Sequence, residues 1–148
     1  MIEKATLKDL KEILDLQHFA YITEANRFNN MNIEPLTETL DELIKEYEKG
    51  IVLKMVIDNK IIGSVRGYID NDTLHINKLM VHQSFRGNGY AKELIRKIEE
   101  FYPNKRYELF TSTRSIENIN LYQKLGYKIF KYKKIDNDLE FVYLEKNK

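Results

Sequence analysis

Apolar residues recur every three or four positions over the first part of the chain, which predicts a long amphipathic helix. Residues 2–5 are predicted to form a short strand before it. Thr6 with Asp9 three positions later is typical of a helix N-terminus, and the helix is expected to continue to about Ala25. The predicted stripe consists of Leu7, Leu10, Ile13, Leu14, Gln17, Ala20 and Tyr21.

A polar segment separates this helix from the next one. Residues 26–36 contain four asparagines and a proline, so we expect a loop there. A second amphipathic helix is predicted from about Thr37 to a stop at Gly50. Its apolar face consists of Leu40, Leu43, Ile44 and Tyr47.

From residue 51 onward the pattern changes to that of β-strands. Apolar and β-branched residues fill 51–57, 61–69 and 73–81, and short polar turns at 58–60 and 71–72 separate them. Strands joined by such short turns pair in antiparallel fashion, so a three-stranded meander is predicted.

In the third strand of this meander the apolar residues change parity. Leu74 and Ile76 share one face by the period of two, whereas Leu79 and Val81 fall on the opposite parity. A β-bulge at positions 77–78 would return all four to one face. A strand buried on both faces would need no bulge, and the pattern alone does not separate these alternatives.

The second half of the chain is predicted to continue as helix, strand, helix and a closing pair of strands. These elements are expected at 89–102, 107–111, 115–126, 127–135 and 139–145. The last helix has an apolar stripe of Ile116, Ile119, Tyr122 and Leu125. The order of strand, two helices, three strands, helix, strand, helix and two strands indicates a mixed α/β class.

The composition fits one globular domain over residues 1–148 and excludes several chemistries. Of the 148 residues, 43% are hydrophobic and 32% are charged. The absence of cysteine excludes disulfides, thiolate metal sites and a cysteine nucleophile. A net charge of +1 gives no reason to expect a nucleic-acid or membrane partner. Neither a signal-peptide pattern nor a stretch of ~20 apolar residues is visible, so we expect a cytoplasmic protein.

Two of the six glycines lie close together in the segment VHQSFRGNGYA, residues 81–91. In a strand, glycine turn and helix start, backbone N–H groups and the helix dipole face an anion. Gly87 and Gly89 would let the main chain approach a ligand closely, and Arg86 would add a charged fork. A dinucleotide fingerprint would need glycine in place of Lys92, and no Walker sequence is present. On these residues alone an ordinary tight turn explains the glycines equally well.

A second segment, SIENINLYQKLGY at residues 115–127, favours the ligand-binding loop over the ordinary turn. Together the two segments closely resemble motifs of the GCN5-related N-acetyltransferase (GNAT) superfamily. The first is similar to its acyl-coenzyme A pyrophosphate loop, Arg/Gln-x-x-Gly-x-Gly/Ala, through Arg86, Gly89 and Ala91. The second resembles its helix ending Leu-Tyr-x-Lys-x-Gly-Phe/Tyr through Leu121, Tyr122, Lys124, Gly126 and Tyr127. Ser115 stands where the family often has asparagine and is itself a good helix cap.

The resemblance implies a single mixed, mostly antiparallel sheet flanked by helices, with a splay between the central strands. Acetyl-coenzyme A would be the cosubstrate, without a metal, and would lie in the splay between the strands that end at Val81 and Thr111. Its pantetheine would hydrogen-bond along residues 79–81, and its pyrophosphate would bind the N–H groups of residues 86–91. The implied cofactor-binding residues are Leu79, Met80, Val81, Arg86, Gly87, Asn88, Gly89, Tyr90, Ala91 and Asn118.

Tyr122 and Asn118 are the candidates for chemistry on the second segment. By carry-over from the family, Tyr122 is the candidate general acid that protonates the departing thiolate. Asn118 lies four positions earlier on the same helix face, where it would hold the cofactor. Tyr122 also belongs to the apolar stripe, so a purely structural role is the alternative. A backbone N–H near Met80 or Val81 would stabilise the oxyanion formed when an amine attacks the thioester.

The residues that handle the acceptor are less sharply indicated. Glu24 would hold a cationic amine or accept its proton through water, and a solvated helix charge is its alternative. His75 is a second candidate base because the pKa of imidazole suits proton transfer, and an exposed strand residue is its alternative. Tyr21 and Phe28 would line the acceptor pocket.

Taken with the resemblance, the sequence predicts an N-acetyltransferase that moves an acetyl group directly to a primary amine. A small-molecule acceptor is favoured over a protein N-terminus or lysine. The alternative is a non-catalytic acyl-coenzyme A-binding or sensing module, against which Tyr122 argues. The family implies a monomer or homodimer, and the basic run at 131–134 is expected to solvate a strand.

Overall fold

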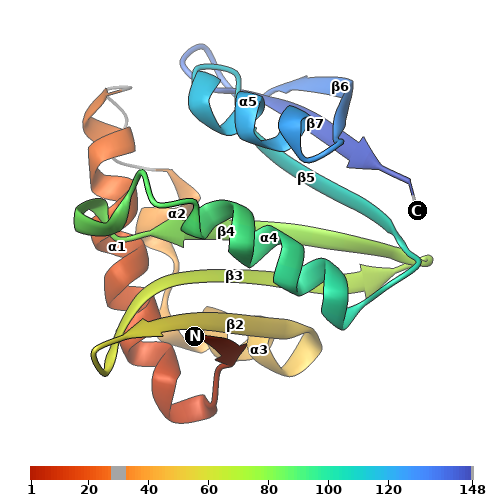
Figure 1. Cartoon of the computed structure of the whole chain (residues 1–148). Helices are drawn as coiled ribbons and strands as arrows, with labels where there is room; N and C mark the ends of the chain where they lie inside the picture. Colours follow the sequence, from red (N-terminus) through yellow and green to blue (C-terminus); the bar gives the residue numbers. More distant parts are fainter. Residues whose placement is uncertain (28–32, 148) are drawn as a thin grey trace.

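The computed structural model describes residues 1–27 and 33–147, in which seven strands and five α-helices form a sheet with helices on both faces (Figure 1). The strands are β1 (Ile2–Lys4), β2 (Ile51–Ile57), β3 (Lys60–Asp70), β4 (Thr73–Val81), β5 (Arg106–Ser112), β6 (Lys128–Lys134) and β7 (Glu140–Lys146). The helices are α1 (Leu10–Arg27), α2 (Glu34–Thr37), α3 (Leu40–Lys49), α4 (Tyr90–Phe101) and α5 (Ile116–Lys124).

The sheet has the strand order β1-β2-β3-β4-β5-β7-β6. Every neighbouring pair is antiparallel except β4 and β5, which are parallel. One apolar core lies between the sheet and helices α4 and α5, and a second lies between the sheet and helices α1 and α3. The predicted mixed fold is therefore confirmed. Among the described residues, no helix has the length and apolar character needed to cross a membrane.

The predicted start of the first helix is present, with a tighter first turn. The Asp9 carboxylate accepts hydrogen bonds from the N–H and the hydroxyl of Thr6 at 2.8 and 2.9 Å. Residues Leu7–Asp9 form a 3-10 turn before α1. Leu7 was expected in the buried stripe but is exposed, because it belongs to this turn and not to the α-helix.

The predicted loop over 26–36 is partly helical. α1 continues to Arg27, and Glu34–Thr37 form α2 with Pro35 in its first turn. Proline suits this position because its φ is already helical and its missing N–H would have no intrahelical partner. Phe28 lies outside the described residues.

The second long helix, α3, begins at Leu40 and not at Thr37 as predicted. Thr39 is its N-cap: its hydroxyl accepts from the Glu42 N–H at 3.2 Å, and its own N–H donates to the Glu42 carboxylate at 2.8 Å. This reciprocal capping box fixes the helix start. The predicted stop at Gly50 is confirmed.

The meander of β2, β3 and β4 is confirmed, and β4 contains the bulge that its change of parity suggested. The register passes from Ser64 opposite Met80 to Arg66 opposite Asn77, so β4 has one more residue than β3 in this interval. Lys78 adopts a φ of 54° there. The core below α4 and α5 consequently receives Leu74, Ile76, Leu79 and Val81 from one strand.

The remaining elements follow the predicted order, and the central strands separate. β4 and β5 pair only between Thr73–His75 and Arg106–Glu108. Beyond this point they diverge toward the end of the sheet where α1 lies (Figure 1), which is the splay that the family resemblance implied. Ile116 was expected to be buried, but it lies in the first turn of α5 and is exposed.

Candidate active site in the splay

The loop between β4 and α4 owes its two glycines to backbone conformation. Gly87 and Gly89 have φ values of 82° and 78°, in the left-handed region that side chains with a Cβ disfavour. A Cβ at either position would meet no atom within 4 Å. Packing therefore does not require glycine here, and the space beside the loop is open.

The same loop presents backbone donors at the start of α4. The first hydrogen bond of the helix runs from the Glu93 N–H to the Gly89 carbonyl at 3.1 Å, so the N–H groups of residues 90–92 lack an intrahelical partner. The Asn88 side-chain amide donates to the Phe85 carbonyl at 3.0 Å and holds the loop from within. Free N–H groups at the positive end of a helix dipole suit a phosphate.

At the end of β4, the N–H and carbonyl of one residue are directed into the splay. The His82 N–H donates to the Ile62 carbonyl of β3 at 2.7 Å. Because donors alternate along an antiparallel strand, Met80 directs its N–H toward β3, whereas Val81 directs its N–H and carbonyl away from it. Arg86 Nε donates to this Val81 carbonyl at 3.4 Å. Of the two predicted oxyanion donors, Val81 is thus the one that faces the splay.

Helix α5 contributes Tyr122 and Asn118. Tyr122 is only 5% exposed, and its ring centroid lies 6.1 Å from that of Tyr127. Burial, and then the nearby charge of Glu24, raise the pKa of the Tyr122 hydroxyl well above its usual value, so it keeps its proton at neutral pH. The Asn118 side chain donates to Thr111 Oγ1 on β5 at 3.4 Å.

Helix α1 brings Glu24 and Tyr21 to the same place. Glu24 Oε1 accepts a hydrogen bond from the Ser115 hydroxyl at 2.9 Å, which joins α1 to the start of α5. The Tyr21 hydroxyl donates to the Leu79 carbonyl at 3.2 Å. Burial, Glu24 and Tyr122 all raise the pKa of Tyr21, in that order. The predicted pair Glu24 and Tyr122 therefore lie close enough to interact electrostatically, with Tyr21 beside them.

His75, the other candidate base, lies in the closed part of the splay. It stacks on Tyr68 with ring centroids 4.9 Å apart, and its Nδ1 lies 3.7 Å from Glu108 Oε2. At a strand rise of ~3.3 Å per residue, about 20 Å separates it from Val81. The structure does not bring His75 together with Tyr122.

A buried charged cluster next to the site was not anticipated from the sequence. Arg66 is 2% exposed, and its Nη1 donates to Glu38 Oε1 and to Glu46 Oε2, both at 2.9 Å. Its Nη2 donates to Gln17 Oε1. The available signals were an arginine in the middle of an apolar strand and a glutamine within an apolar helix stripe.

The two carboxyl groups of this cluster titrate differently. Burial acts to raise the pKa of Glu38, but hydrogen bonds from Glu46, Gln17 and Arg66 and the Arg66 charge outweigh it and lower this pKa to about 2. Burial and the contact with Glu38 raise the pKa of Glu46 to about 7, against the attraction of Arg66 and Lys78. Below pH 7 the pair therefore carries one proton, which resides mainly on Glu46.

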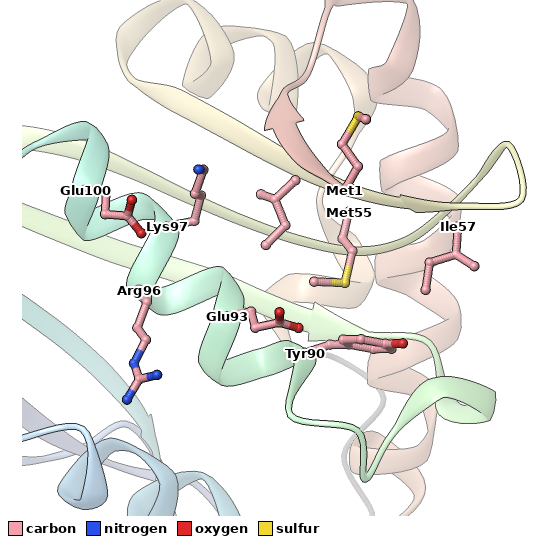
Figure 2. A pocket seen from close by; sticks show the side chains of 9 residues that line it. Met1, Met55, Ile57, Tyr90, Glu93, Arg96, Lys97 and Glu100 are labelled. Atoms are coloured by element: carbon pink, nitrogen blue, oxygen red, sulfur yellow. The ribbon is translucent and has the colours of Figure 1, made fainter.

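A hollow of about 430 Å³ lies between β1, β2 and α4, on the side of α4 away from β5. Figure 2 shows Met1, Met55 and Tyr90 grouped there, with Glu93 and Lys97 along α4 and Arg96 pointing away. The Tyr90 side chain thus lines a different space from the one that its N–H faces.

A second hollow of about 320 Å³ lies between the β5–α5 turn and the β6–β7 turn. Its lining is polar and includes Thr113 and Arg114, which immediately precede Ser115. The residues before α5 and the turn between β6 and β7 therefore enclose this space.

Known proteins are similar to this chain in sequence over part of its length. N-acetylaspartate synthetase of Xenopus tropicalis is 33% identical over 78 residues, which are 49% of this chain and 29% of that protein. N-alpha-acetyltransferase 20 of Dictyostelium discoideum is 25% identical over 118 residues, which are 71% of this chain and 68% of that protein. The chain thus spans less than a third of the synthetase.

Solved structures match over nearly the whole chain. The PaiA N-acetyltransferase of Thermoplasma acidophilum, in complex with coenzyme A, has a TM-score of 0.81 at 16% identity, with 100% of this chain and 98% of that chain covered. The yncA protein of Salmonella typhimurium, with its cofactor acetyl-CoA, has a TM-score of 0.79 at 16% identity, with 99% and 92% covered. At these identities the likeness shows a shared fold.

The family model described as "Acetyltransferase (GNAT) family" matches residues 9–127, which is more than half of the chain. This span contains both the segment with the paired glycines and the segment that ends in Leu-Gly-Tyr. The chain therefore belongs to the acetyltransferase (GNAT) family.

Proposed function

We propose that residues 1–148 form one N-acetyltransferase domain that moves the acetyl group of acetyl-coenzyme A directly to a primary amine. The observation that carries this proposal is the junction of β4 and α4 at the open end of the splay. There two left-handed glycines, free N–H groups and a helix dipole face open space. Family membership and neighbours of the same fold with coenzyme A or acetyl-coenzyme A bound support it.

In this proposal the cofactor is held mainly by main-chain groups. The N–H groups of residues 87–91 bind the pyrophosphate, and Arg86 adds a charged donor. The carbonyl of Val81 hydrogen-bonds the pantetheine, because it is directed into the splay, and the Val81 N–H is left for the thioester oxygen. Asn118 supports it from α5, and Leu79 and Met80 line the same strand.

The thioester supplies an activated acetyl group, and residues of this chain handle its charges and protons. Glu24 takes a proton from the incoming ammonium group, directly or through water, so that the amine nitrogen can attack the carbonyl carbon. The Val81 N–H donates to the carbonyl oxygen as it becomes negative. As the C–S bond of the tetrahedral adduct breaks, the Tyr122 hydroxyl gives its proton to the sulfur. The nitrogen loses its second proton to water, and Tyr122 and Glu24 return to their starting protonation states by exchange with water.

The acceptor in this proposal is a small cationic amine. The Glu24 carboxylate offers a counter-charge for an ammonium group, and its hydrogen bond to Ser115 holds it between two helices. Ser115 and Tyr122 are buried and Tyr21 is partly buried, so Glu24 lies beside side chains that are largely removed from solvent. These features favour a small molecule over a protein N-terminus or lysine side chain.

Thermal unfolding with acetyl-coenzyme A, free coenzyme A and NADPH tests the cofactor assignment. A ligand at ~100 times its Kd stabilises by about 2.7 kcal/mol, which is a Tm rise of roughly 5 to 10 °C for a chain of this size. Both coenzyme A forms are expected to give this rise and NADPH none. Absence of a shift at saturation would contradict the proposal.

A thiol-release assay with a panel of primary amines then tests the reaction. The panel contains polyamines, amino-acid amides and a short peptide with a free N-terminus. Turnover of a small amine above the rate of the peptide is expected. Binding of acetyl-coenzyme A without turnover of any amine would instead favour the non-catalytic acyl-coenzyme A-binding module.

A further inference from the structure

One face of α1 is hydrogen-bonded to three different elements. Gln17, Tyr21 and Glu24 are four and three positions apart and so lie on the same side of the helix. Gln17 accepts from Arg66 of β3, Tyr21 donates to the carbonyl at the bulge of β4, and Glu24 accepts from the hydroxyl that precedes α5. This face connects the buried charged cluster to the open end of the splay.

Gln17 is the innermost of these three contacts. Its side chain is fully buried, and its Nε2 donates to the Pro35 carbonyl and to Glu38 Oε1, both at 2.9 Å. With Arg66 bound to its Oε1, both ends of the amide are engaged. Gln17 therefore fixes α1 against β3 and against the segment that contains α2.

Arg66 lies at the centre of this arrangement. It lies opposite Asn77 at the edge of the β4 bulge, and the next residue, Lys78, forms an ion pair with Glu34 of α2 at 2.8 Å. Within the described residues, Arg66 Nε and Asn77 Oδ1 are buried without a hydrogen-bond partner. Buried ion networks are often no more stable than apolar packing of the same volume. A contribution to geometry therefore explains this arginine better than a contribution to stability.

We propose that Arg66 is a positioning residue for the acceptor end of the site, acting through Gln17. Arg66 sets the position of α1 along β3, and α1 in turn presents the Glu24 carboxylate to the amine. The inference rests on the proposed function, in which Glu24 handles the acceptor. Arg66 itself touches none of the reacting atoms.

The chain offers a test variant and a matched control on the same helix. Gln17→Met removes the amide while keeping an unbranched side chain of similar length, and it leaves Arg66 paired with both carboxylates. Near the other end of α1, Glu12 Oε2 accepts from the Ile61 N–H of β3 at 2.9 Å. Glu12→Met removes that contact between α1 and β3 and leaves the acceptor end untouched.

Amide hydrogen exchange measures the positioning without any acceptor. In Gln17→Met we expect the amides of residues 21–25 to exchange about 10-fold faster or more, while those of residues 11–15 keep their native rates. Glu12→Met should show the opposite pattern. Arg66→Lys, which keeps the charge but lacks the planar fork, should reproduce the Gln17→Met pattern more weakly.

Kinetics with the amine that gives the highest turnover in the panel measures the consequence for the reaction. We expect kcat/KM for that amine to fall about 10- to 100-fold in Gln17→Met, with a shifted pH profile and an unchanged Kd for acetyl-coenzyme A. A purely structural role would lower Tm in both methionine variants and leave the pH profile of the folded fraction unmoved.

The proposal is overturned if Gln17→Met keeps native exchange at residues 21–25, or if Glu12→Met loosens the same residues equally. An unchanged pH profile and kcat/KM in Gln17→Met also overturn it. If the wild-type protein turns over no amine, the proposed function fails, and the exchange pattern alone then decides whether Arg66 positions this end of α1.

Discussion

The two ends of the splay are built in different ways. In the proposed function, the cofactor end binds through main-chain N–H donors of one short segment, residues 87–91, shaped by two glycines. At the acceptor end the corresponding groups are side chains that distant parts of the chain bring together. Ser115 and Glu24 are 91 positions apart, and Arg66 and Gln17 are 49 apart. The first arrangement leaves a local sequence motif, whereas the second leaves none.

This difference predicts which substitutions each end tolerates. A site made of backbone donors depends on φ and ψ, so changes that keep the backbone conformation should have little effect there. A site made of side chains held by long-range hydrogen bonds depends on the identity of each residue. Tyr122 belongs to neither end alone, because it contacts the core below α5 and lies near Glu24.

The largest effect is therefore expected for Tyr122→Phe. Loss of the hydroxyl removes the proposed proton donor to the thiolate, and general acids contribute about 100-fold or more to kcat. The Kd for acetyl-coenzyme A and the Tm should change little because the ring stays in the core. Steady-state thiol release and calorimetric titration measure the two quantities.

Tyr107→Phe is the matched control for this experiment. Tyr107 is a buried tyrosine in the same core, and its hydroxyl donates to the Tyr102 carbonyl at 2.8 Å, outside the splay. The Tyr107→Phe variant should have a lower Tm than the native protein and the same kcat. Native turnover in Tyr122→Phe would leave Tyr122 with the purely structural role that its apolar stripe also allows.

A smaller effect, confined to the cofactor end, is expected for Gly89→Ala. The added Cβ meets no neighbour, so the cost is that of a left-handed φ of 78°, about 1–2 kcal/mol. A loop that relaxes to avoid this cost no longer presents its N–H groups, and the Kd for acetyl-coenzyme A should rise about 10-fold for each 1.4 kcal/mol lost. Calorimetric titration gives the Kd, and thermal unfolding gives the stability.

Gly126→Ala separates strain from ligand binding. Gly126 has a φ of 100°, and a Cβ there would meet the Lys146 side chain at 3.2 Å. Its loss of stability should be comparable, with no change in the Kd. If both alanine variants bind acetyl-coenzyme A as tightly as the native protein, the backbone account of the cofactor end is wrong.

The sequence predicted the features that depend on local patterns. The parity change after Ile76 made a bulge one of two alternatives, and the structure has the bulge. The strand, glycine turn and helix start were predicted and are present, whereas anion binding there stays a prediction. α2 was missed because a four-residue helix inside an asparagine-rich segment has no periodicity to detect. The splay came from the family resemblance, since periodicity does not show where two parallel strands stop pairing.

The charged cluster was missed for a different physical reason. Gln17 fell in an apolar stripe and Arg66 in an apolar strand, and each signals a buried polar group without showing its partner. Pairing them requires knowing which face of α1 packs on which face of β3. The same information separates the two candidate bases in space, because β4 and β5 pair beside His75, whereas the base role of Glu24 stays a prediction.

The smallest of these effects concerns pH and is confined to the acceptor side. The folded pKa of Glu46, about 7, is higher than its usual 4.5, so the folded state binds more protons between these values. The stability that this proton contributes is fully present below pH 4.5 and is lost as pH rises through 7. Glu38, with its pKa lowered to about 2, loses its contribution only as pH falls toward 2.

The free energy of unfolding of the native protein should therefore fall between pH 5 and pH 8, and Glu46→Gln should remove part of this fall. The Glu46 side chain is 34% exposed and shares its proton with Glu38, so it contributes less to the free energy of unfolding than its pKa shift alone implies. We expect a contribution of about 1 kcal/mol, or roughly 3 °C in Tm. The neutral amide would keep the contact with Arg66 at both pH values, so the Tm difference between them should shrink. Glu48→Gln, on the exposed side of the same helix, should leave that difference as in the native protein. Equal shrinkage in both variants would assign the pH dependence to the overall charge of α3 and not to the cluster of Arg66, Glu38 and Glu46.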